Sequence, residues 1–399
     1  MNFTELVAPN GLFCDGDWIE KKDQDMNGGV RLIQLADVGV CTFKNKSAKF
    51  LTECKAQELN CTYLQKGDIL IARLPEPLGR ACSFPLDGKY VTAVDIAIVR
   101  VTRHDVNPKY VMYMLNSPGF RSEIKKYESG TTRKRISRKN LDKIQFDIPT
   151  LPEQERIVAR IEKLFSQLDA SVNELKTAKE RLRVYRQAVL KETLDSVRDV
   201  CEITTIQSVC EDIKVGIVIK PTQYYVDSGG VRAFRNANVR RGFIEDNDWA
   251  MISKDGHEKN KRSEVHTGDV LIARSGVNLG MAAAVPERFD GYNAIDVVIA
   301  VPKQERILSK YLAYYTNSPY GINCVKENQR GVAQGHLNVK VYGKLPLMLP
   351  ALEHQEQVIS KIEEQLSVCD GIGKTVDNAL QQTEALRQSI LKKAFEGGL

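Results

Sequence analysis

The sequence predicts an α+β protein made of two copies of one large module, each a mixed α/β domain followed by a long helix. Three observations carry this prediction. The chain aligns with itself at a constant offset, the first part of each copy is rich in β-branched and aromatic residues, and the second part carries a coiled-coil-like apolar stripe. A chain of 399 residues is long enough for two or three domains.

The internal repeat has an offset of 201 residues (229 minus 28), from GGVRLIQLADVG at Gly28 to GGVRAFRNANVR at Gly229. The same offset relates GDILIAR to GDVLIAR, AVDIAIV to AIDVVIA, NSP to NSP, IPTLPEQERIVARIE to LPALEHQEQVISKIE, and RQAVLK to RQSILK. The period is far longer than the roughly 20–50 residues of solenoid repeats. These separated matches in one register indicate the duplication of a whole module.

The first part of each module is predicted to hold buried strands and short helices. KGDILIARL and TGDVLIARS each place a β-branched run after a Gly-Asp turn, and TAVDIAIVRV and YNAIDVVIAVP predict further strands. PKYVMYMLNSP and SKYLAYYTNSP predict short amphipathic helices that end at Ser-Pro. Each first part can therefore form its own hydrophobic core.

The second part of each module is predicted to be one long helix. No Gly or Pro occurs from Glu153 to about Asp195, which gives about 43 residues and roughly 65 Å at ~1.5 Å per residue. Apolar residues step by three or four along it, and the second copy keeps this stripe except near Gly371 and Gly373. The stripe residues that we expect to pack against a partner helix or docking protein are Ile157, Ile161, Leu164, Leu182, Val358, Ile362, Leu386 and Ile390.

A lone helix of this length exposes an apolar stripe, and the nearest partner that can bury it is the repeat. The chain leaves the first helix, builds the second module and returns in the second helix. We therefore expect antiparallel pairing with one domain at each end, a dumbbell with a pseudo-twofold axis; two separate homodimeric coiled coils are the alternative. The predicted parts are the first domain at 1–149, the first helix at 150–198, the second domain at 199–349 and the second helix at 350–399.

Composition excludes several classes of protein. The formal net charge of +6 (57 basic minus 51 acidic residues) permits a polyanionic partner without requiring one. No segment approaches the ~18 consecutive apolar residues of a membrane span, and the N-terminus does not have the pattern of a signal peptide. The nine cysteines are an odd number without C-x-x-C spacing, which favours reduced thiols and a cytoplasmic location.

Enzyme motifs are absent from the sequence. It contains no F-x-G-x-G or G-x-S-x-G string, the five histidines have no metal-ligand spacing, and GIGKT lacks the first glycine of a phosphate-binding loop. NSPY at Asn317 resembles a methyltransferase N-P-P-Y loop, but the other copy reads NSPG, which favours a helix stop in both. We expect a non-catalytic chain without a metal or cofactor of its own; an enzyme with an unrecognised site is an alternative.

Nucleic-acid binding is indicated by a basic window between Arg121 and Lys143, which holds nine basic and three acidic residues. Its segment TTRKRISRK (131–139) corresponds to VAQGHLNVK (332–340) in the second copy. Arg and Lys contact guanine or phosphate, and Gln and Asn contact adenine, so the difference fits two domains that read different sequences. An ordinary surface loop that has drifted between copies is the alternative. The candidates are Thr131, Arg133, Lys134, Arg135, Gln334, His336 and Asn338.

Other loops add further candidates for DNA contacts. Arginines follow both GDxLIAR strands, with pairing to Asp95 or Asp296 as the alternative role. A third set lies in the segment that follows the repeated GGVR string, where capping of a strand edge is the alternative, and a polar loop of the first copy offers phosphate contacts. The candidates in these loops are Lys44, Lys46, Arg73, Arg235, Asn238, Arg274, Ser275 and Asn278.

The order of these parts resembles the specificity subunit of type I restriction-modification systems. A module, an LPxxEQ helix start, a long helix, a second module, a second helix and a terminal RQSILKKAFEG follow one another. The most specific strings are GDVLIARSGVNLG, IPTLPEQERIVARI, LPALEHQEQVISKIEEQL and RQSILKKAFEGGL. The resemblance covers essentially the whole chain, although family members often carry a further tail after the second helix.

The resemblance implies two target recognition domains, each binding one half of a bipartite, asymmetric site in double-stranded DNA. It also implies that the two helical regions fix the gap between the half-sites and dock two methyltransferase subunits, which bring S-adenosylmethionine. Two motor-nuclease restriction subunits would complete the complex. A stand-alone DNA-binding scaffold or regulator without methyltransferase partners is the alternative function.

Overall fold

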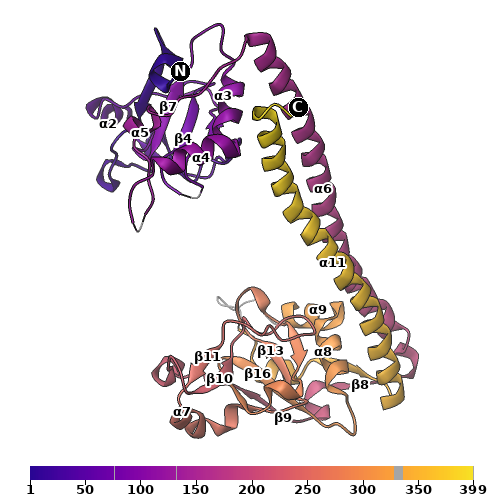
Figure 1. The fold of residues 1–399 in the computed structure, drawn as a ribbon. Helices are drawn as coiled ribbons and strands as arrows, with labels where there is room; N and C mark the ends of the chain where they lie inside the picture. The colour runs from indigo at the N-terminus through magenta and orange to yellow at the C-terminus, as the bar shows by residue number, and fades with distance from the viewer. Residues whose placement is uncertain (76, 132, 328–335, 399) are drawn as a thin grey trace. The chain divides into compact units, whose positions relative to one another are not determined.

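A computed structural model describes residues 1–75, 77–131, 133–327 and 336–398 of the chain (Figure 1). The chain divides into two compact units: unit 1 contains Met1–Leu175 and Asn378–Leu399, and unit 2 contains Lys176–Asp377. Each unit combines a mixed α/β domain, here called its head, with a part of each of two long helices. The predicted α+β class with two mixed domains and long helices is confirmed.

The head of unit 1 is built on a four-stranded antiparallel sheet and a smaller three-stranded sheet. Its strands are β1 (Leu12–Asp15), β2 (Val30–Ile33), β3 (Lys49–Leu51), β4 (Ile69–Ala72), β5 (Ala81–Ser83), β6 (Tyr90–Thr92) and β7 (Ile96–Arg100). Its helices are α1 (Phe3–Val7), α2 (Glu53–Glu58), α3 (Pro108–Leu115), α4 (Pro118–Lys126) and α5 (Arg138–Leu141). The sheets have the orders β1-β7-β4-β5 and β3-β2-β6, and α3 packs against β5.

The head of unit 2 repeats this plan and adds a short two-stranded sheet. Its strands are β8 (Glu202–Thr205), β9 (Cys210–Val215), β10 (Val231–Phe234), β11 (Ala250–Ile252), β12 (Glu264–Val265), β13 (Val270–Ala273), β14 (Ala282–Ala284), β15 (Tyr292–Ala294), β16 (Val297–Pro302) and β17 (Pro346–Leu349). Its helices are α7 (Lys254–Lys259), α8 (Ser309–Asn317), α9 (Pro319–Glu327) and α10 (Val339–Gly343). The sheets have the orders β14-β13-β16-β9, β11-β10-β15-β12 and β17-β8.

The duplication extends to the pairing of strands. In unit 1, Ile69 of β4 lies opposite Val99 of β7, and in unit 2, Val270 of β13 lies opposite Ala300 of β16, so both partners move by the same 201 residues. The pairing of β2 with β6 is parallel, as is that of β10 with β15. The repeat read from the sequence is therefore a repeat of topology and register.

The Gly-Asp turn before β4 and β13 explains the shared GDxLIAR string. Gly67 and Gly268 have φ angles of +95° and +88°, in the left-handed region that glycine enters without a steric cost. The carboxylates of Asp68 and Asp269 each accept a main-chain hydrogen bond at 2.8 Å from the residue three positions earlier. The turn thus starts a strand whose four residues are all buried in both units.

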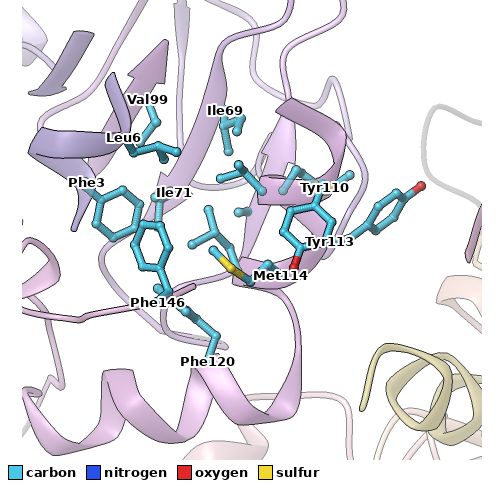
Figure 2. Close-up of a cluster of buried hydrophobic side chains, with 14 of the residues drawn as sticks. Phe3, Leu6, Ile69, Ile71, Val99, Tyr110, Tyr113, Met114, Phe120 and Phe146 are labelled. Carbon is cyan, nitrogen blue, oxygen red and sulfur yellow. The ribbon is translucent and has the colours of Figure 1, made fainter. Parts of the chain in front are cut away.

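Aromatic and branched side chains fill the core of unit 1 (Figure 2). The Phe3 ring contacts the Phe120 and Phe146 rings edge to face, with centroids 6.2 and 5.3 Å apart. Full burial of such a side chain contributes about 1.5–3 kcal/mol to stability. The first helix of the chain is therefore held under the sheet by contacts with residues more than a hundred positions later.

The long helices are α6 (Leu151–Asp195) and α11 (Leu352–Phe395), each without a break. In unit 1, the start of α6 and the end of α11 pack on the same head, because Ile161 and Leu391 are both fully buried in its core. In unit 2, the end of α6 and the start of α11 do the same through Leu194 and Ile362. Within each unit the two helices therefore run antiparallel.

Ion pairs between the helices follow the same repeat. Arg387 pairs with Asp169 in unit 1, and Arg186 pairs with Asp370 in unit 2, so donor and acceptor exchange helices at an offset of 201 residues. The aspartates are more than half exposed. Each pair therefore adds little stability, typically below about 1 kcal/mol, but it specifies the antiparallel register.

The glutamine of the LPxxEQ string joins α6 to its head. The Gln154 side chain is fully buried, and its Oε1 accepts a hydrogen bond of 2.7 Å from the Asn107 main-chain nitrogen. Its Nε2 donates to the carbonyl oxygens of Asp105 and Pro149 at 2.9 and 2.8 Å. All hydrogen-bonding capacity except one lone pair of Oε1 is thus used between the start of the helix and the loop before α3.

Gln355 makes the equivalent contacts at the start of α11 in unit 2. It accepts from the Leu308 nitrogen at 2.8 Å and donates to the carbonyl oxygens of Arg306 and Pro350, each at 2.9 Å. The residue is also fully buried. This shared buried amide is the physical reason for the glutamine in both helix-start motifs.

The NSP strings also have a structural role. Asn116 and Asn317 each accept a hydrogen bond from, and donate one to, the main chain of a strand residue, which is Ala81 in β5 and Ala282 in β14. The hydroxyl of Tyr320 in NSPY donates to a carboxylate oxygen of Asp195 at the end of α6. These contacts agree with the helix-stop interpretation of NSPY.

Among the described helices, none combines the length and apolarity of a membrane span.

Asp17, between β1 and the smaller sheet of unit 1, provides a pH-dependent prediction. Its carboxylate accepts a hydrogen bond of 3.0 Å from the Thr62 nitrogen, and burial raises the pKa of Asp17 from 3.8 to about 6. The folded state then holds a proton that the unfolded state releases between these values, so this group lowers stability as pH rises from about 4 to 6. We expect Asp17→Asn to raise the melting temperature at pH 8 by about 2 °C.

Calorimetry from pH 4 to pH 8 measures this effect. The difference between Asp17→Asn and the parent protein should become small at pH 4, where the carboxyl is protonated in the folded state and about half protonated in the unfolded state. Asp147→Asn is the control, because Asp147 is exposed. A difference that does not change with pH would contradict the assignment.

Candidate nucleic-acid interface

Three loops meet at the end of β4 in unit 1. The Ile136 nitrogen donates a 3.1 Å hydrogen bond to the Arg73 carbonyl, which ties the basic window to the loop after β4. Arg80, nearly buried, donates from Nε to the Val38 carbonyl at 2.7 Å and from Nη2 to the Leu35 carbonyl at 2.9 Å. The three candidate regions found in the sequence thus form one edge of the head.

The same three loops meet at the end of β13 in unit 2. The Leu337 nitrogen donates to the Arg274 carbonyl at 2.8 Å, at the positions equivalent to Ile136 and Arg73. The Asn278 side chain donates to the Asn236 carbonyl at 2.9 Å and so replaces Arg80 as the link between the loops. Each unit therefore presents an equivalent loop edge, assembled with different side chains.

The loop edge of unit 1 is cationic. Lys44, Lys46, Arg133 and Arg135 are exposed, and the part of the chain that the structure describes offers none of them an ion pair. Lys134, in contrast, pairs with Glu128. Thr131 is exposed in the same loop. Exposed cations of this kind are suited to phosphate contacts.

Arg73 and Arg274 each pair with a carboxylate of their own head, which is the alternative role that the sequence analysis considered for them. Their side chains are only 15% and 18% exposed. Arg274 Nη1 lies 3.1 Å from Asp296 Oδ1, as the sequence alternative stated, whereas Arg73 Nη1 lies 3.4 Å from an oxygen of Asp15, not of Asp95. Both arginines are therefore held within their own heads and carry a partly neutralised charge to the loop edge.

Asn238 is buried and shapes the loop that contains it. Its Oδ1 accepts from the Arg235 nitrogen at 2.9 Å, and its Nδ2 donates to the Glu245 and Asn247 carbonyls at 3.2 and 2.8 Å. Asp37 occupies the same position in unit 1 and is also buried. Asn238 thus has the capping role that was the alternative to base contact. The Arg235 side chain pairs with Asp248 at 2.8 Å.

The remaining candidates of unit 2 differ in accessibility. His336 is exposed. Asn338 caps α10 by accepting from the Lys340 nitrogen at 2.8 Å, and Ser275 accepts from the Asn236 amide at 2.9 Å. Asn278 is nearly buried. Gln334 lies outside the described residues.

The helix residues predicted to dock a partner divide into two groups. Ile157, Ile161, Val358 and Ile362 are buried against the heads, so they belong to the domain cores and not to a surface that a partner protein can reach. The others remain at least partly exposed: Leu164, Leu182, Leu386 and Ile390. The sequence stripe did not distinguish these groups because a head and a partner helix require the same apolar periodicity.

Two residues at the loop edge of unit 2 were not anticipated. Val277, at the tip of the short 3-10 helix Gly276–Asn278, is 97% exposed, and Arg241 lies in the loop that follows Asn238. Comparison of the two copies would have indicated Arg241, because the equivalent residue of unit 1 is Val40. Comparison of the two copies gives no such indication for Val277.

The cysteines beside the loop edge of unit 1 are protonated at neutral pH. Burial raises the pKa of Cys41 and of Cys82 to about 12, so neither thiol forms a nucleophilic thiolate at neutral pH. Burial also lowers the pKa of Arg80 from its usual range. Within the described residues, no group of three or more His, Cys, Asp or Glu side chains is arranged to hold a metal ion.

The duplicated fold thus carries an equivalent loop edge on each of its two heads. Residues 14–180 match the family profile described as the type I restriction modification DNA specificity domain. The type I restriction enzyme EcoBI specificity subunit of Escherichia coli is 27% identical over 325 residues, which are 75% of this chain and 68% of that protein. The EcoKI specificity subunit of Escherichia coli strain K12 is 25% identical over 311 residues, 73% of this chain and 65% of that protein.

A solved structure on complex assembly and conformational transition of the type I R-M system has the same fold. It superposes with a TM-score of 0.71 at 17% sequence identity and covers 100% of this chain and 97% of that chain. The match to the curated relatives spans about two thirds of their length. By the profile match over residues 14–180 and by these relatives, the chain is similar to the specificity subunits of type I restriction-modification systems.

Proposed function

We propose that each head binds one half of a bipartite, asymmetric site in double-stranded DNA and that the helices α6 and α11 set the gap between the half-sites. The observation that carries this proposal is the pair of equivalent loop edges with different side chains. Lys44, Lys46, Arg133 and Arg135 occupy one edge, whereas His336 and Asn338 belong to the other. Equivalent position with different chemistry is what two reading heads with different target sequences require.

The catalytic steps belong to partner subunits in this proposal. Two methyltransferase subunits dock on exposed parts of the long helices, bind S-adenosylmethionine and methylate one adenine on each strand, which they flip out of the duplex. Two restriction subunits add DNA translocation and cleavage, and the complex acts in the cytoplasm. The present chain contributes recognition and positioning.

Methylation profiling of a genome exposed to the chain and its methyltransferase partners tests the proposal. The expected result is methylated adenine within two short defined sequences that are separated by a gap of fixed length. Binding of DNA by the chain without co-purification of a methyltransferase would favour a stand-alone scaffold. Methyl transfer by the purified chain alone would refute its non-catalytic role.

Arg133→Ala tests the basic loop of unit 1. The Arg133 side chain is exposed and has no ion-pair partner among the described residues, so its removal should leave folding intact. Loss of one phosphate contact reduces the slope of log affinity against log salt concentration by about 0.9. Fluorescence anisotropy of a labelled duplex from 50 to 200 mM salt measures this slope.

The control for this measurement is Lys163→Ala, which removes an exposed cation from α6. It should leave the slope at the value of the parent protein. An unchanged slope for Arg133→Ala would remove this side chain from the DNA interface.

A further inference from the structure

A hollow of about 610 Å³ lies in unit 2 between the loop edge of the head and the long helices. Four cationic side chains line it: Arg183 and Arg186 from α6, Arg241 from the loop after Asn238, and Lys326 from the end of α9. No acidic residue is among the described residues that line it. The hollow therefore concentrates positive charge at one place in unit 2.

Most of this charge is not neutralised. Arg186 pairs with Asp370. Arg183 lies 3.1 Å from Glu180 but is 78% exposed, so solvent weakens that pair. Arg241 donates a long, 3.5 Å hydrogen bond to the Asn317 carbonyl. For Arg241 and for Lys326, the described part of the chain supplies no carboxylate partner.

Unit 1 contains the equivalent hollow, with a volume of about 580 Å³. Arg387, Gln388 and Leu391 line it at positions 201 residues after Arg186, Gln187 and Leu190, which line the hollow of unit 2. The residues that match Arg241 and Arg183, however, are Val40 and Glu384.

The charge of the two hollows therefore differs although their architecture is shared. In unit 1, two cations, Lys44 and Arg387, and two carboxylates, Asp169 and Glu384, line the hollow, and Arg387 forms an ion pair with Asp169. The equivalent helices and head of unit 1 thus fold around a hollow that carries no excess charge. Since like charges in one hollow repel each other, the cations of unit 2 oppose folding slightly, and an anionic ligand accounts for their presence.

The rim of the hollow continues into the loop edge of unit 2. Arg241 belongs to the loop that Asn238 shapes, and Val277 at the rim is the exposed tip of the loop after β13. A duplex that lies on this loop edge would bring its backbone to the rim. The guanidinium groups of Arg183 and Arg241 offer forked donors that match the geometry of phosphate oxygens.

We propose that this hollow binds backbone phosphates of DNA beside the half-site that the head of unit 2 reads. This inference rests on the proposed function and adds to it a phosphate-binding hollow whose counterpart in unit 1 carries no excess positive charge. An acidic segment of a partner protein would suit the same charge, but continuity with the loop edge favours the phosphate backbone.

The two copies supply the test variants. Arg183→Glu combined with Arg241→Val gives the hollow of unit 2 the residues that unit 1 tolerates at the same positions. Loss of two phosphate contacts should reduce the salt slope of DNA binding by about 1.8, at ~0.9 for each contact. The reverse exchange in unit 1, Glu384→Arg with Val40→Arg, should make the salt dependence of DNA binding steeper. Binding is measured with the full chain and its methyltransferase partners, on a duplex with the methylated site and on a scrambled duplex.

The outcomes separate this inference from the proposed function. A flatter slope for the first double variant with its preference for the methylated site retained supports the phosphate site. An unchanged slope for this variant overturns the phosphate site, whether or not the parent protein prefers the methylated duplex to the scrambled one. Unchanged DNA binding with loss of methyltransferase co-purification also overturns it and assigns the hollow to a protein partner. If the parent does not prefer the methylated duplex, the proposed function fails, and the slopes on the scrambled duplex still decide the inference.

Discussion

Replacement of Gln154 by alanine is expected to reduce the free energy of unfolding of unit 1 by about 3–5 kcal/mol. The mutation deletes a fully buried side chain with three hydrogen bonds to main-chain groups. The Asn107 nitrogen and the carbonyl oxygens of Asp105 and Pro149 would lose their partner, and each buried unsatisfied group costs about 1–3 kcal/mol. Water that enters the vacated space would recover part of this loss.

Chemical denaturation monitored by circular dichroism measures the effect. Gln355→Ala should destabilise unit 2 to a similar degree, because its three hydrogen bonds are equivalent. Gln167→Ala is the matched control, since this exposed glutamine of α6 can be removed at a cost below about 0.5 kcal/mol. A loss below 1 kcal/mol for Gln154→Ala would show that the amide does not hold the helix to the head.

Much of the fold could be predicted because a duplication provides two readings of each element. A constant offset from Gly28 onward required that both copies share topology, and the absence of Gly and Pro after Glu153 required a long helix. Antiparallel pairing followed from chain connectivity. The matched ion pairs of Arg387 with Asp169 and Arg186 with Asp370 now give its register within each unit.

Burial of individual site residues could not be predicted in the same way. Arg73 pairs with Asp15 in β1, which lies 58 positions earlier (73 minus 15), and no local pattern announces such a contact. Asn238 has the side chain of a base-reading residue, but its amide is consumed by the main chain of its own loop. A polar residue that reads a ligand and one that organises a loop have the same sequence signature, so only the three-dimensional contacts separate them.

Lengthening both long helices by four residues is expected to lengthen the unread gap of the methylated DNA site and to leave both half-site sequences unchanged. The insertions follow Leu175 in α6 and Asp377 in α11, where the two units meet along the chain, so each unit keeps its own core and ion pairs. Four residues add roughly 6 Å of helix, which corresponds to about two base pairs at ~3.4 Å each. A step of four residues also keeps the apolar stripe close to its original phase.

The expected methylome therefore contains both original half-site sequences with a gap that is about two base pairs longer. The reason is that the bases are read by loop edges within each head, whereas the gap depends on the helices that connect them. Genome-wide sequencing of methylated adenine in a strain with the lengthened chain measures both quantities at once. A changed half-site with the original gap would contradict the division of labour between heads and helices, because it would mean that the helices themselves determine which bases are read.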